Sequence, residues 1–518
     1  MKRVVAVVEI LLIVGLFFAV AGVATPGINE AHYLVKSKNF WDPSWCSRDL
    51  FVSSGNPHWL FHATFGALTQ WYSLSVSAWI GRWIGWTMIA IGIHAVTRTM
   101  TDRSGASLGV AVIWIAGIEY FNLAGEWVVG GIEGKVPAYG LMLLALAWMV
   151  EGKWRRVWLT LGLASGFHVL VGGWSVLAGL VVYWRCGRNQ ESARSQLLPL
   201  CAGGVIALSG IYPAWALTRG VDPETVATAA KIYTFERLSH HLTPAGLESA
   251  WYVRHSVLIV IFGCVSWRLR NDESFTVIRW FTILMVSLAV IGMWLGILPS
   301  VAPELSAKLL RYYWFRMTDS IVPLAVALAW ARLVVVDTDA RWSTIARGGL
   351  LVVSGCLLGL SANKTTQMTV ITEQGQVVSA EGMFTNRENR TRVVSDWVAV
   401  CQWVNRTLPQ DEVLLTPRNQ HTFKWYAGRA EVVNWKDVPQ DAQRLVQWSK
   451  TFYDVFPLRL GTVRVTVRYP DLIRYREQYG ARFMVVDRRY SGESLPLVQV
   501  YPVGPMEINE TYAVYRLP

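Results

Sequence analysis

Apolar runs long enough to cross a lipid bilayer recur along this 518-residue chain, and they limit its fold more than any other feature. A helix advances about 1.5 Å per residue, so roughly 20 apolar residues span the hydrocarbon of a membrane. The runs lie near 4–24, 74–97, 106–124, 136–150, 196–217, 254–269, 275–297, 317–336 and 346–362. They predict an α-helical polytopic membrane protein.

A further run, 157–184, is too long for one crossing and contains the sequence GFHVLVGGW. Two glycines after a histidine predict two short helices that meet at a break at Gly172-Gly173. We interpret His168, in its apolar surroundings, as a structural residue that caps backbone groups freed by the break. With this break the chain has about eleven crossings by the length rule.

Basic residues between the apolar runs indicate the orientation, because cytoplasmic loops carry an excess of Lys and Arg. The short basic loops contain Arg98 and Arg103, then 153–156, 185–188, 268–270 and 341–347. They share one side of the membrane only if 157–184 crosses twice. The first run follows MKR and lacks a good cleavage site, so we expect an uncleaved helix with a cytoplasmic N-terminus. The outer loops are then 25–73, 125–135, 218–253 and 298–316.

The composition agrees with this interpretation. Hydrophobic residues make up 53% of the chain and charged residues only 16%, which is not the composition of a soluble protein. The formal net charge of +12 resides mostly in short loops between apolar runs. Because that pattern fits membrane orientation, we expect membrane lipid as a partner and no nucleic acid.

The chain divides at about residue 362 into a multi-span domain, 1–362, and a polar domain, 363–518. In the second part Val393, Trp397, Val400 and Val404 form an apolar face at helical spacing. Residues 438–456 are also helical in pattern, whereas 412–416, 482–487 and the C-terminal TYAVYRL are strand-like. This alternation predicts an extracytoplasmic α/β domain.

Polar clusters gather in the predicted outer loops. The first is PGINEAHYLVKSKNFWDPSWCSRDLF, 26–51, which contains the carboxylates of Glu30 and Asp49. Charges this near the hydrocarbon are costly and commonly functional. The alternatives are a solvated interfacial loop and, for arginines, anchors that reach the headgroups. The charged and ionisable residues of the other loops are Glu126, Glu133, Lys135, Arg237, His240, His241, Arg311 and Arg316.

Known catalytic and nucleotide motifs are not found in the sequence, which has no GxGxxG, P-loop, GxSxG or HExxH. His240 and His241 look like a metal pair, but neighbours in sequence point in different directions and no carboxylate lies at ligand spacing. We therefore predict no metal site, with a divalent cation as the open alternative. The segment 416–433 follows a strand, where α/β folds place ligand sites, but a surface loop is the favoured interpretation.

A first span followed by an outer loop that begins NEAHY resembles the GT-C superfamily of integral membrane glycosyltransferases, which includes protein O-mannosyltransferases. The superfamily places an Asp-Glu pair there, and Asn29 stands at the Asp position, which leaves Glu30. Stretches such as WCSRDLF and TFKWYAGR also resemble those of uncharacterised bacterial multi-span proteins. The resemblance implies many spans, an outer C-terminal domain and a place in the bacterial cytoplasmic (inner) membrane.

The resemblance also implies transfer of a sugar from a polyprenyl-phosphate-linked donor to an unknown acceptor on the outer face. A carboxylate has to take the proton of the acceptor hydroxyl, and cations have to stabilise the departing phosphate. We predict Asp49 or Glu30 as the base. Arg311, Arg316, Arg237 and Lys135 are the predicted phosphate ligands, and Glu126, Glu133, His240 and His241 are weaker candidates for an acceptor or metal contact.

Two other functions remain open at this stage. A non-catalytic scaffold of envelope polysaccharide assembly could have the same architecture. Asn29, which stands where the superfamily has an aspartate, is consistent with this alternative. A transporter of lipid-linked glycans needs polar residues deep within spans and often has repeated halves. No internal repeat is apparent in the sequence, and its charges gather in the loops.

The orientation can be tested by labelling single cysteines in intact cells. We expect a membrane-impermeant thiol reagent to label residues in 218–253 and in the C-terminal domain but not in 185–194, because the break makes 185–194 cytoplasmic. Labelling of 185–194 from outside would contradict the predicted topology.

Overall fold

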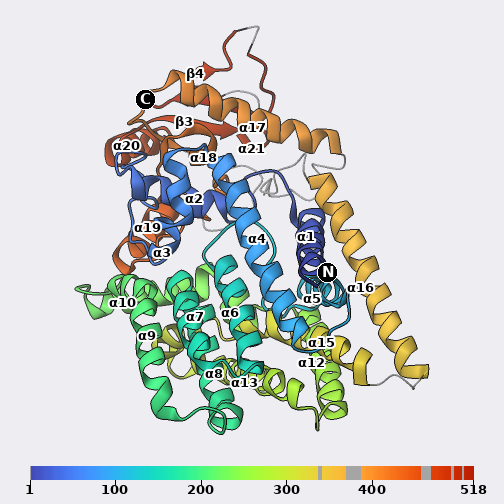
Figure 1. Ribbon diagram of the computed structural model, residues 1–518. Coiled ribbons are helices and arrows are strands. Elements are labelled where there is room, and N and C mark those ends of the chain that lie inside the picture. The colour runs from blue at the N-terminus through green and yellow to red at the C-terminus, as the bar shows by residue number, and fades with distance from the viewer. Residues whose placement is uncertain (1, 337–340, 369–386, 457–467, 492–494, 505–506) are drawn as a thin grey trace. The chain divides into compact units, whose positions relative to one another are not determined.

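The computed structural model describes residues 2–336, 341–368, 387–456, 468–491, 495–504 and 507–518, which divide into two compact units (Figure 1). The helical unit comprises Met1–Gly22, Pro57–Phe61 and Ile80–Thr365. The sheet unit comprises Val23–Asn56, His62–Trp79 and Thr366–Pro518. Most of the first predicted outer loop thus belongs to the same unit as the C-terminal segment, an assignment that the sequence-based division at 362 did not include.

The helices of the helical unit follow the apolar runs of the sequence. They are α1 (Lys2–Ala21), α4 (Leu74–Arg98, within this unit from Ile80), α5 (Ala106–Phe121), α6 (Lys135–Val150), α7 (Trp154–Phe167), α8 (Val169–Val182), α9 (Ala193–Ala216), α10 (Pro223–Lys231), α11 (Ser239–Leu242), α12 (Ser249–Arg268), α13 (Glu273–Leu295), α14 (Pro303–Leu310), α15 (Arg316–Val336) and α16 (Arg341–Met368). The π-helical turns Tyr183–Gly187 and Ile232–Arg237 extend α8 and α10.

Eight helices within the described ranges are long and apolar enough to cross a membrane. These spans are Arg3–Ala21, Leu74–Arg98, Val169–Gly187, Ala193–Ala216, Ser249–Arg268, Glu273–Ser300, Arg316–Val336 and Thr344–Thr365. The apolar helices α5 and α6 are shorter. The predicted helical, membrane-compatible architecture is confirmed at this level, and the count of about eleven crossings stays a prediction.

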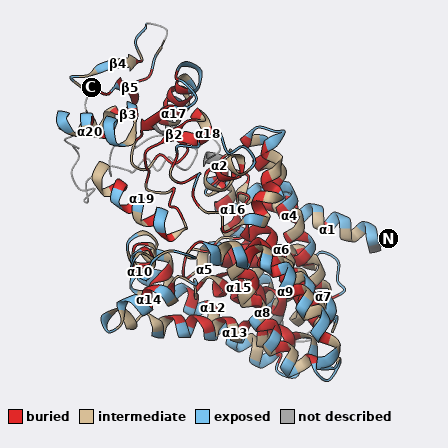
Figure 2. Cartoon of the chain, turned by 90° about the vertical axis from the view of Figure 1, so that its left-hand side faces the viewer, coloured by how far each residue is buried: buried red, intermediate tan, exposed pale blue. Residues whose placement is uncertain are grey.

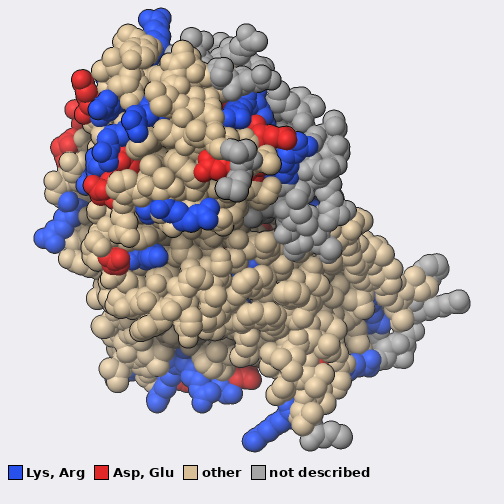
Figure 3. Space-filling view, turned by 90° about the horizontal axis from the view of Figure 1, so that it is seen from above, with Lys and Arg blue, Asp and Glu red and all other residues tan. Residues whose placement is uncertain are grey.

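Apolar side chains on the outer helices of this unit remain exposed. Val205 of α9, Val260 of α12 and Val352 of α16 are each more than 60% exposed. Figure 2 shows exposed and intermediate residues along α12 and α13, and Figure 3 shows a broad surface without Lys, Arg, Asp or Glu. Water makes such surfaces unfavourable, whereas lipid chains do not, so these faces suit helices surrounded by lipid.

The long run 157–184 forms two helices, as predicted, but the break lies at His168 rather than at the glycine pair. His168 has extended backbone geometry, and its Nδ1 accepts a hydrogen bond from Val171 N at 3.2 Å. The predicted capping role of His168 is therefore confirmed. Gly172 instead lets α8 approach α7, because a Cβ there would lie 2.2 Å from Ser165 N.

Helix α15 forms the centre of the helical unit. It packs against α5, α12 and α13, and nearly all of its residues from Met317 to Ala329 are buried. A Cβ at Gly117 of α5 would lie 2.5 Å from Pro323 Cβ. Small residues permit this close helix approach, which gives dispersion contacts in place of a hydrophobic driving force.

The sheet unit contains a five-stranded mixed sheet in the order β2-β1-β3-β5-β4. Its strands are β1 (Val413–Leu415), β2 (Ala430–Glu431), β3 (Ala481–Asp487), β4 (Val498–Tyr501) and β5 (Tyr512–Arg516). β1 pairs in parallel with β2 and β3, whereas β5 is antiparallel to β3 and β4. The predicted strands at 412–416, 482–487 and the C-terminus correspond to β1, β3 and β5.

Helices cover this sheet and complete its core. The helices of the unit are α2 (Glu30–Trp41), α17 (Arg387–Thr407), α18 (Phe423–Ala427), α19 (Ala442–Val455), α20 (Tyr469–Tyr479) and α21 (Arg488–Ser491), with α3 (Trp59–Ala63) at the division of the units. The predicted apolar face of α17 packs on the strands through Val393, Trp397 and Val400, which meet Leu414, Val485 and Val514 in one buried cluster. The helix-and-strand alternation thus produces the expected small α/β domain.

A glycine substitution tests the packing of α7 on α9. A Cβ at Gly162 would lie 2.2 Å from the carbonyl oxygen of Gly203, whereas a Cβ at Gly204 meets nothing within 4 Å. Overpacking of this kind costs about 1–3 kcal/mol, so we expect Gly162→Ala to lower the thermal unfolding midpoint of the detergent-solubilised protein. Gly204→Ala, on the same helix pair, is the matched control. Equal midpoints for the two variants would contradict the described packing.

Candidate functional site

In the helical unit, a buried carboxylate of α15 fixes the loop that follows α5. Asp319 accepts hydrogen bonds from three backbone donors of this loop, Leu123 N at 2.6 Å, Ala124 N at 2.9 Å and Glu126 N at 3.1 Å. A carboxylate with several N–H donors is a strong anchor, since charge-assisted hydrogen bonds exceed neutral ones. Asp319 thereby positions the side chain of Glu126.

Four of the predicted loop residues meet at this point and form what we call the Glu126 cluster: Glu126, Glu133, Lys135 and Arg316. Glu126 Oε1 lies 3.2 Å from Lys135 Nζ, and Glu126 Oε2 lies 2.9 Å from Arg316 Nε. Lys135 Nζ also contacts Glu133 Oε1 at 3.0 Å. The cluster therefore holds two cations and two carboxylates close together with little water, where charges interact more strongly than at a surface.

Aromatic side chains connect Arg311 to this cluster. The guanidinium of Arg316 lies 3.9 Å from the ring centre of Tyr313, and that of Arg311 lies 5.9 Å from the ring centre of Tyr233. The two tyrosine hydroxyls are 3.1 Å apart. Tyr313 has a positive φ of 53°, an uncommon backbone conformation for a non-glycine residue. Two predicted phosphate ligands thus lie against tyrosine rings whose hydroxyls are hydrogen-bonded to each other.

His241 lies next to the same loop, since its Nδ1 is 2.6 Å from the carbonyl oxygen of Ala124. Burial and the neighbouring ring of His240 lower the pKa of His241 to about 3, so it is neutral at pH 7. The ring centre of His240 lies 4.1 Å from that of His241, and burial and the charge of Arg237 lower the pKa of His240. The described residues contain no group of three or more His, Cys, Asp and Glu placed to hold a metal ion.

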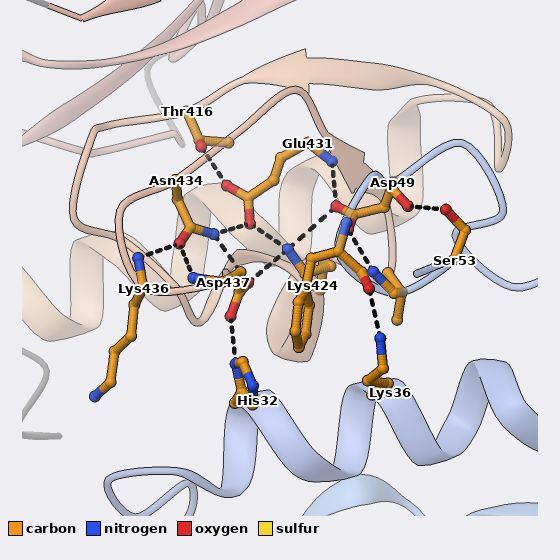
Figure 4. Close-up of polar contacts among 12 residues, drawn as sticks. His32, Lys36, Asp49, Ser53, Thr416, Lys424, Glu431, Asn434, Lys436 and Asp437 are labelled. Atoms are coloured by element: carbon orange, nitrogen blue, oxygen red, sulfur yellow. Dashed lines mark hydrogen bonds and ion pairs between the residues drawn. The ribbon is translucent and has the colours of Figure 1, made fainter. Parts of the chain in front are cut away.

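A second charged cluster lies in the sheet unit around one buried ammonium (Figure 4). Lys424 Nζ lies 3.1 Å from Asp49 Oδ2, 2.6 Å from Glu431 Oε1 and 2.7 Å from Asp437 Oδ2. All four side chains are at most 2% exposed. We call this group the Lys424 cluster.

Hydrogen bonds hold the carboxylates of the Lys424 cluster in position. Asn434 Nδ2 donates to Glu431 Oε1 at 2.7 Å and to Asp437 Oδ2 at 2.9 Å. The hydroxyl of Thr416 donates a hydrogen bond to Glu431, and His32 Nδ1 lies 3.3 Å from Asp437 Oδ1. Buried charges require such pairing because an isolated one loses its solvation without compensation.

The members of the Lys424 cluster differ in the direction of their pKa shifts. Burial alone lowers the pKa of Lys424, but the negative charges of Asp437, Asp49 and Glu431 raise it well above the usual value. Burial raises the pKa of Asp437, and the opposing charge of Lys424 with the contact from His32 brings it below its ordinary range. Burial and the other carboxylates raise the pKa of Glu431. Of Glu431 and Asp437, Glu431 is therefore the one that more readily keeps a proton.

Asp49, the first of the predicted bases, is a member of this cluster and has every oxygen engaged. Its Oδ1 accepts from Phe51 N and Val52 N, each at 3.0 Å, and its Oδ2 accepts from Glu431 N at 3.2 Å beside Lys424. A base needs a lone pair that can reach the substrate proton. These contacts favour a structural role for Asp49, and its predicted catalytic role stays a prediction.

Glu30, the second predicted base, lies at the start of α2 and is fully buried. Its Oε2 accepts a hydrogen bond from Gly27 N at 2.6 Å. Gly27 precedes the N-cap residue Asn29, and Glu30 N donates to the carbonyl oxygen of Gly27 at 3.1 Å, so the side chain of Glu30 closes the turn that leads into α2. A catalytic role for Glu30 has to accommodate this contact.

Lys36 joins α2 to the loop that carries Asp49. Its Nζ donates to the carbonyl oxygens of Phe51 at 2.8 Å and Ser54 at 3.0 Å. Burial lowers the pKa of Lys36 to about 7. Gly55 N donates to Asp441 Oδ2 at 2.9 Å, which fixes the end of the same loop. The polar groups of 26–56 are thus mostly satisfied within the sheet unit.

The sequence interpretation overlooked Lys424, Glu431 and Asp437 as a cluster. Segment 416–433 was favoured as a surface loop, but it forms α18 and β2, and most of its side chains are buried. That interpretation was wrong because the polar side chains satisfy one another inside the unit. The signal was present: Lys424, Arg429 and Glu431 lie among aromatic and apolar residues directly after a buried strand.

Residues 395–455 match the model of a domain of unknown function, DUF6798. No curated protein has a sequence that matches the chain. The matched segment extends from α17 to the end of α19 and contains Lys424, Glu431 and Asp437 but not Asp49.

Removal of the central ammonium tests the Lys424 cluster. In Lys424→Met three buried carboxylates lose their shared cation, and breaking a buried ion pair costs about 3–5 kcal/mol. We expect a clear drop in the thermal unfolding midpoint of the sheet unit in the full-length protein. Lys450→Met removes an exposed lysine of α19 and serves as the control. If the two variants unfold at the same temperature, Lys424 does not stabilise the unit.

Proposed function

We propose that this chain is an integral membrane glycosyltransferase that transfers a sugar from a polyprenyl-phosphate-linked donor to an acceptor hydroxyl, with the Glu126 cluster at the donor phosphate. The proposal includes the predicted inner-membrane location with outward-facing loops. Eight helices of membrane length support a lipid-linked substrate, and the cluster supplies cations beside those helices.

The observation that carries the proposal is the meeting of Lys135 and Arg316 at the single carboxylate of Glu126. The two cations lie 181 positions apart in the sequence, from Lys135 to Arg316, and the fold brings them together. Glu126 and Tyr313 hold them before any substrate binds, and preorganised charge costs no rearrangement in the transition state. An arginine fork also matches the geometry of phosphate oxygens.

The reaction is a single displacement. The acceptor oxygen forms a bond to the anomeric carbon while the bond from that carbon to the phosphate oxygen breaks. Polyprenyl phosphate leaves with the electron pair, next to Arg316 and Lys135. A carboxylate takes the hydroxyl proton, and the configuration at the anomeric carbon inverts.

Glu133 is the carboxylate that the geometry favours for the proton. Its Oε1 pairs with Lys135 Nζ at 3.0 Å, so a phosphate that binds Lys135 competes with this ion pair. With this ion pair broken, Glu133 can take the hydroxyl proton, whereas Glu126 keeps its contact with Arg316. Asp49 and Glu30, with their backbone hydrogen bonds, are the alternatives from the sequence resemblance.

The cations are tested by sugar transfer from radiolabelled polyprenyl-phosphate donors, with purified protein in lipid vesicles. We expect Arg316→Gln to lower turnover about a hundredfold or more, as loss of a charge-stabilising donor does. Arg254→Ala, which removes an exposed arginine of α12, should keep normal turnover. If the wild type transfers no sugar from any donor of the series, the protein is not this enzyme.

The same assay separates the three carboxylates. Loss of a general base costs about a hundredfold to ten-thousandfold in rate, so we expect Glu133→Gln to lose most turnover. Asp49→Asn and Glu30→Gln should lower thermal stability more than turnover in the protein that remains folded. A large loss of turnover in Asp49→Asn at normal stability would instead identify Asp49, in the first loop, as the base.

A further inference from the structure

The sheet unit contains a cavity of about 550 Å³ that neither charged cluster explains. We call it the Trp45 pocket. Residues from four chain segments line it: the end of α2 with the following loop, 73–75 at the start of α4, the C-terminal part of α17 with the loop after it, and 424–429 at α18. Its volume falls within the range of about 300–1,000 Å³ that is usual for small-molecule sites.

Aromatic rings provide the flat surfaces of this pocket. Trp45, Trp425 and Tyr426 line it, and among its described lining residues Leu74 is the only one with an aliphatic side chain. Lipid chains require aliphatic walls, which this pocket lacks. Indole and phenol rings instead offer flat apolar faces with polar edges, to which the C–H faces of a sugar ring are complementary.

Side-chain amides provide hydrogen-bonding groups around the rings. The side chains of Gln402 and Gln410 line the pocket and make no hydrogen bond to another described residue. Each amide has a carbonyl acceptor and two N–H donors. A sugar hydroxyl both donates and accepts hydrogen bonds. The side-chain amides of Gln402 and Gln410 can do both as well, and neither has to change its protonation state.

A buried arginine adds an unsatisfied donor. Arg429 is 5% exposed, and its terminal nitrogens donate to backbone carbonyl oxygens, including Asn405 O at 2.8 Å and Leu408 O at 2.7 Å. Arg429 Nε is buried and has no partner among the described residues. A buried polar group without a partner is costly, so an acceptor atom of a ligand would be favourable at this position.

The charges of the lining favour an acidic ligand. Within the described residues neither Arg429 nor Lys38 forms an ion pair with a carboxylate, and Lys38 Nζ lies 5.2 Å from the ring centre of Trp45. Lys424 also lines the pocket, but the carboxylates of its own cluster balance its charge. Asp42 is the acidic residue of the lining, and Asp411, outside the lining, acts electrostatically on Arg429. The lining itself therefore carries two cations without an ion pair and one carboxylate.

We propose that the Trp45 pocket binds an acidic saccharide, whose rings stack on Trp45, Trp425 or Tyr426 and whose carboxylate lies near Lys38 and Arg429. Gln402 and Gln410 hydrogen-bond its hydroxyls. This assignment is independent of the proposed transfer reaction, because it concerns binding in the sheet unit and needs no lipid-linked donor.

Isothermal titration calorimetry of the full-length protein in detergent tests the assignment. The probes are short oligouronides, including trigalacturonate and a hyaluronan tetrasaccharide, each compared with its methyl ester, which has the same rings without the charge. We expect at least one acid to bind at least tenfold more tightly than its ester. If no probe binds, or if the esters bind equally well, the assignment is overturned.

Two variants with matched controls locate the binding. Trp45→Ala and Lys38→Ala should each weaken binding of that acid at least tenfold, since they remove a stacking face and a cation. Trp71→Ala removes a tryptophan of the same unit that is 71% exposed and does not line the pocket, and Lys450→Ala removes an exposed lysine. Normal affinity in both pocket variants would place the ligand elsewhere and contradict the proposal.

Discussion

The buried ammonium of Lys424 is the interaction on which the sheet unit depends most. Three carboxylates from two distant parts of the chain, Asp49 and the pair Glu431 and Asp437, surround it within 3.1 Å. Removal of this cation would leave three buried carboxylates without their shared ion-pair partner, which is a large cost in the interior. The cluster therefore explains why a segment next to the first apolar helix belongs to the same compact unit as the C-terminal sheet.

In the helical unit, a buried carboxylate is paired with backbone N–H groups instead of with a side-chain cation. Asp319 of the central helix α15 binds three N–H groups of the loop after α5, and this loop presents Glu126 to Lys135 and Arg316. Irregular backbone among apolar helices needs such partners because lipid offers no hydrogen bonds. Asp319 thus fixes the loop so that Glu126 lies between Lys135 and Arg316. This meeting of two cations makes the Glu126 cluster our candidate for phosphate binding.

Charge compensation distinguishes the two clusters from the Trp45 pocket. In both clusters the cations face carboxylates at ion-pair distance, and this arrangement can stabilise the fold without a ligand. In the pocket, Arg429 is held by backbone carbonyl oxygens and retains a buried donor without a described partner. An unsatisfied group beside aromatic faces points to a ligand more directly than a neutralised cluster does.

Much of the fold could be predicted from the sequence, because helices and strands follow local patterns. The apolar runs, the apolar face of α17 and the strands β1, β3 and β5 lie where hydrophobic spacing placed them. Polar residues near the outer loops, including Lys135 and Arg316, were also identified from their position. The glycine pair at 172–173 misled the prediction of the break, because Gly172 serves the packing of α8 on α7.

Only the tertiary structure decided which charges meet. Asp49 is a predicted base in the first outer loop, but its partner Lys424 lies in a distant segment whose sequence pattern favours a surface loop. An ion pair depends on the distance and burial of two side chains, and neither is encoded in the local pattern of one of them. The sequence by itself determined the elements and supplied the charged residues, whereas the packing of remote segments determined which of those residues balance one another.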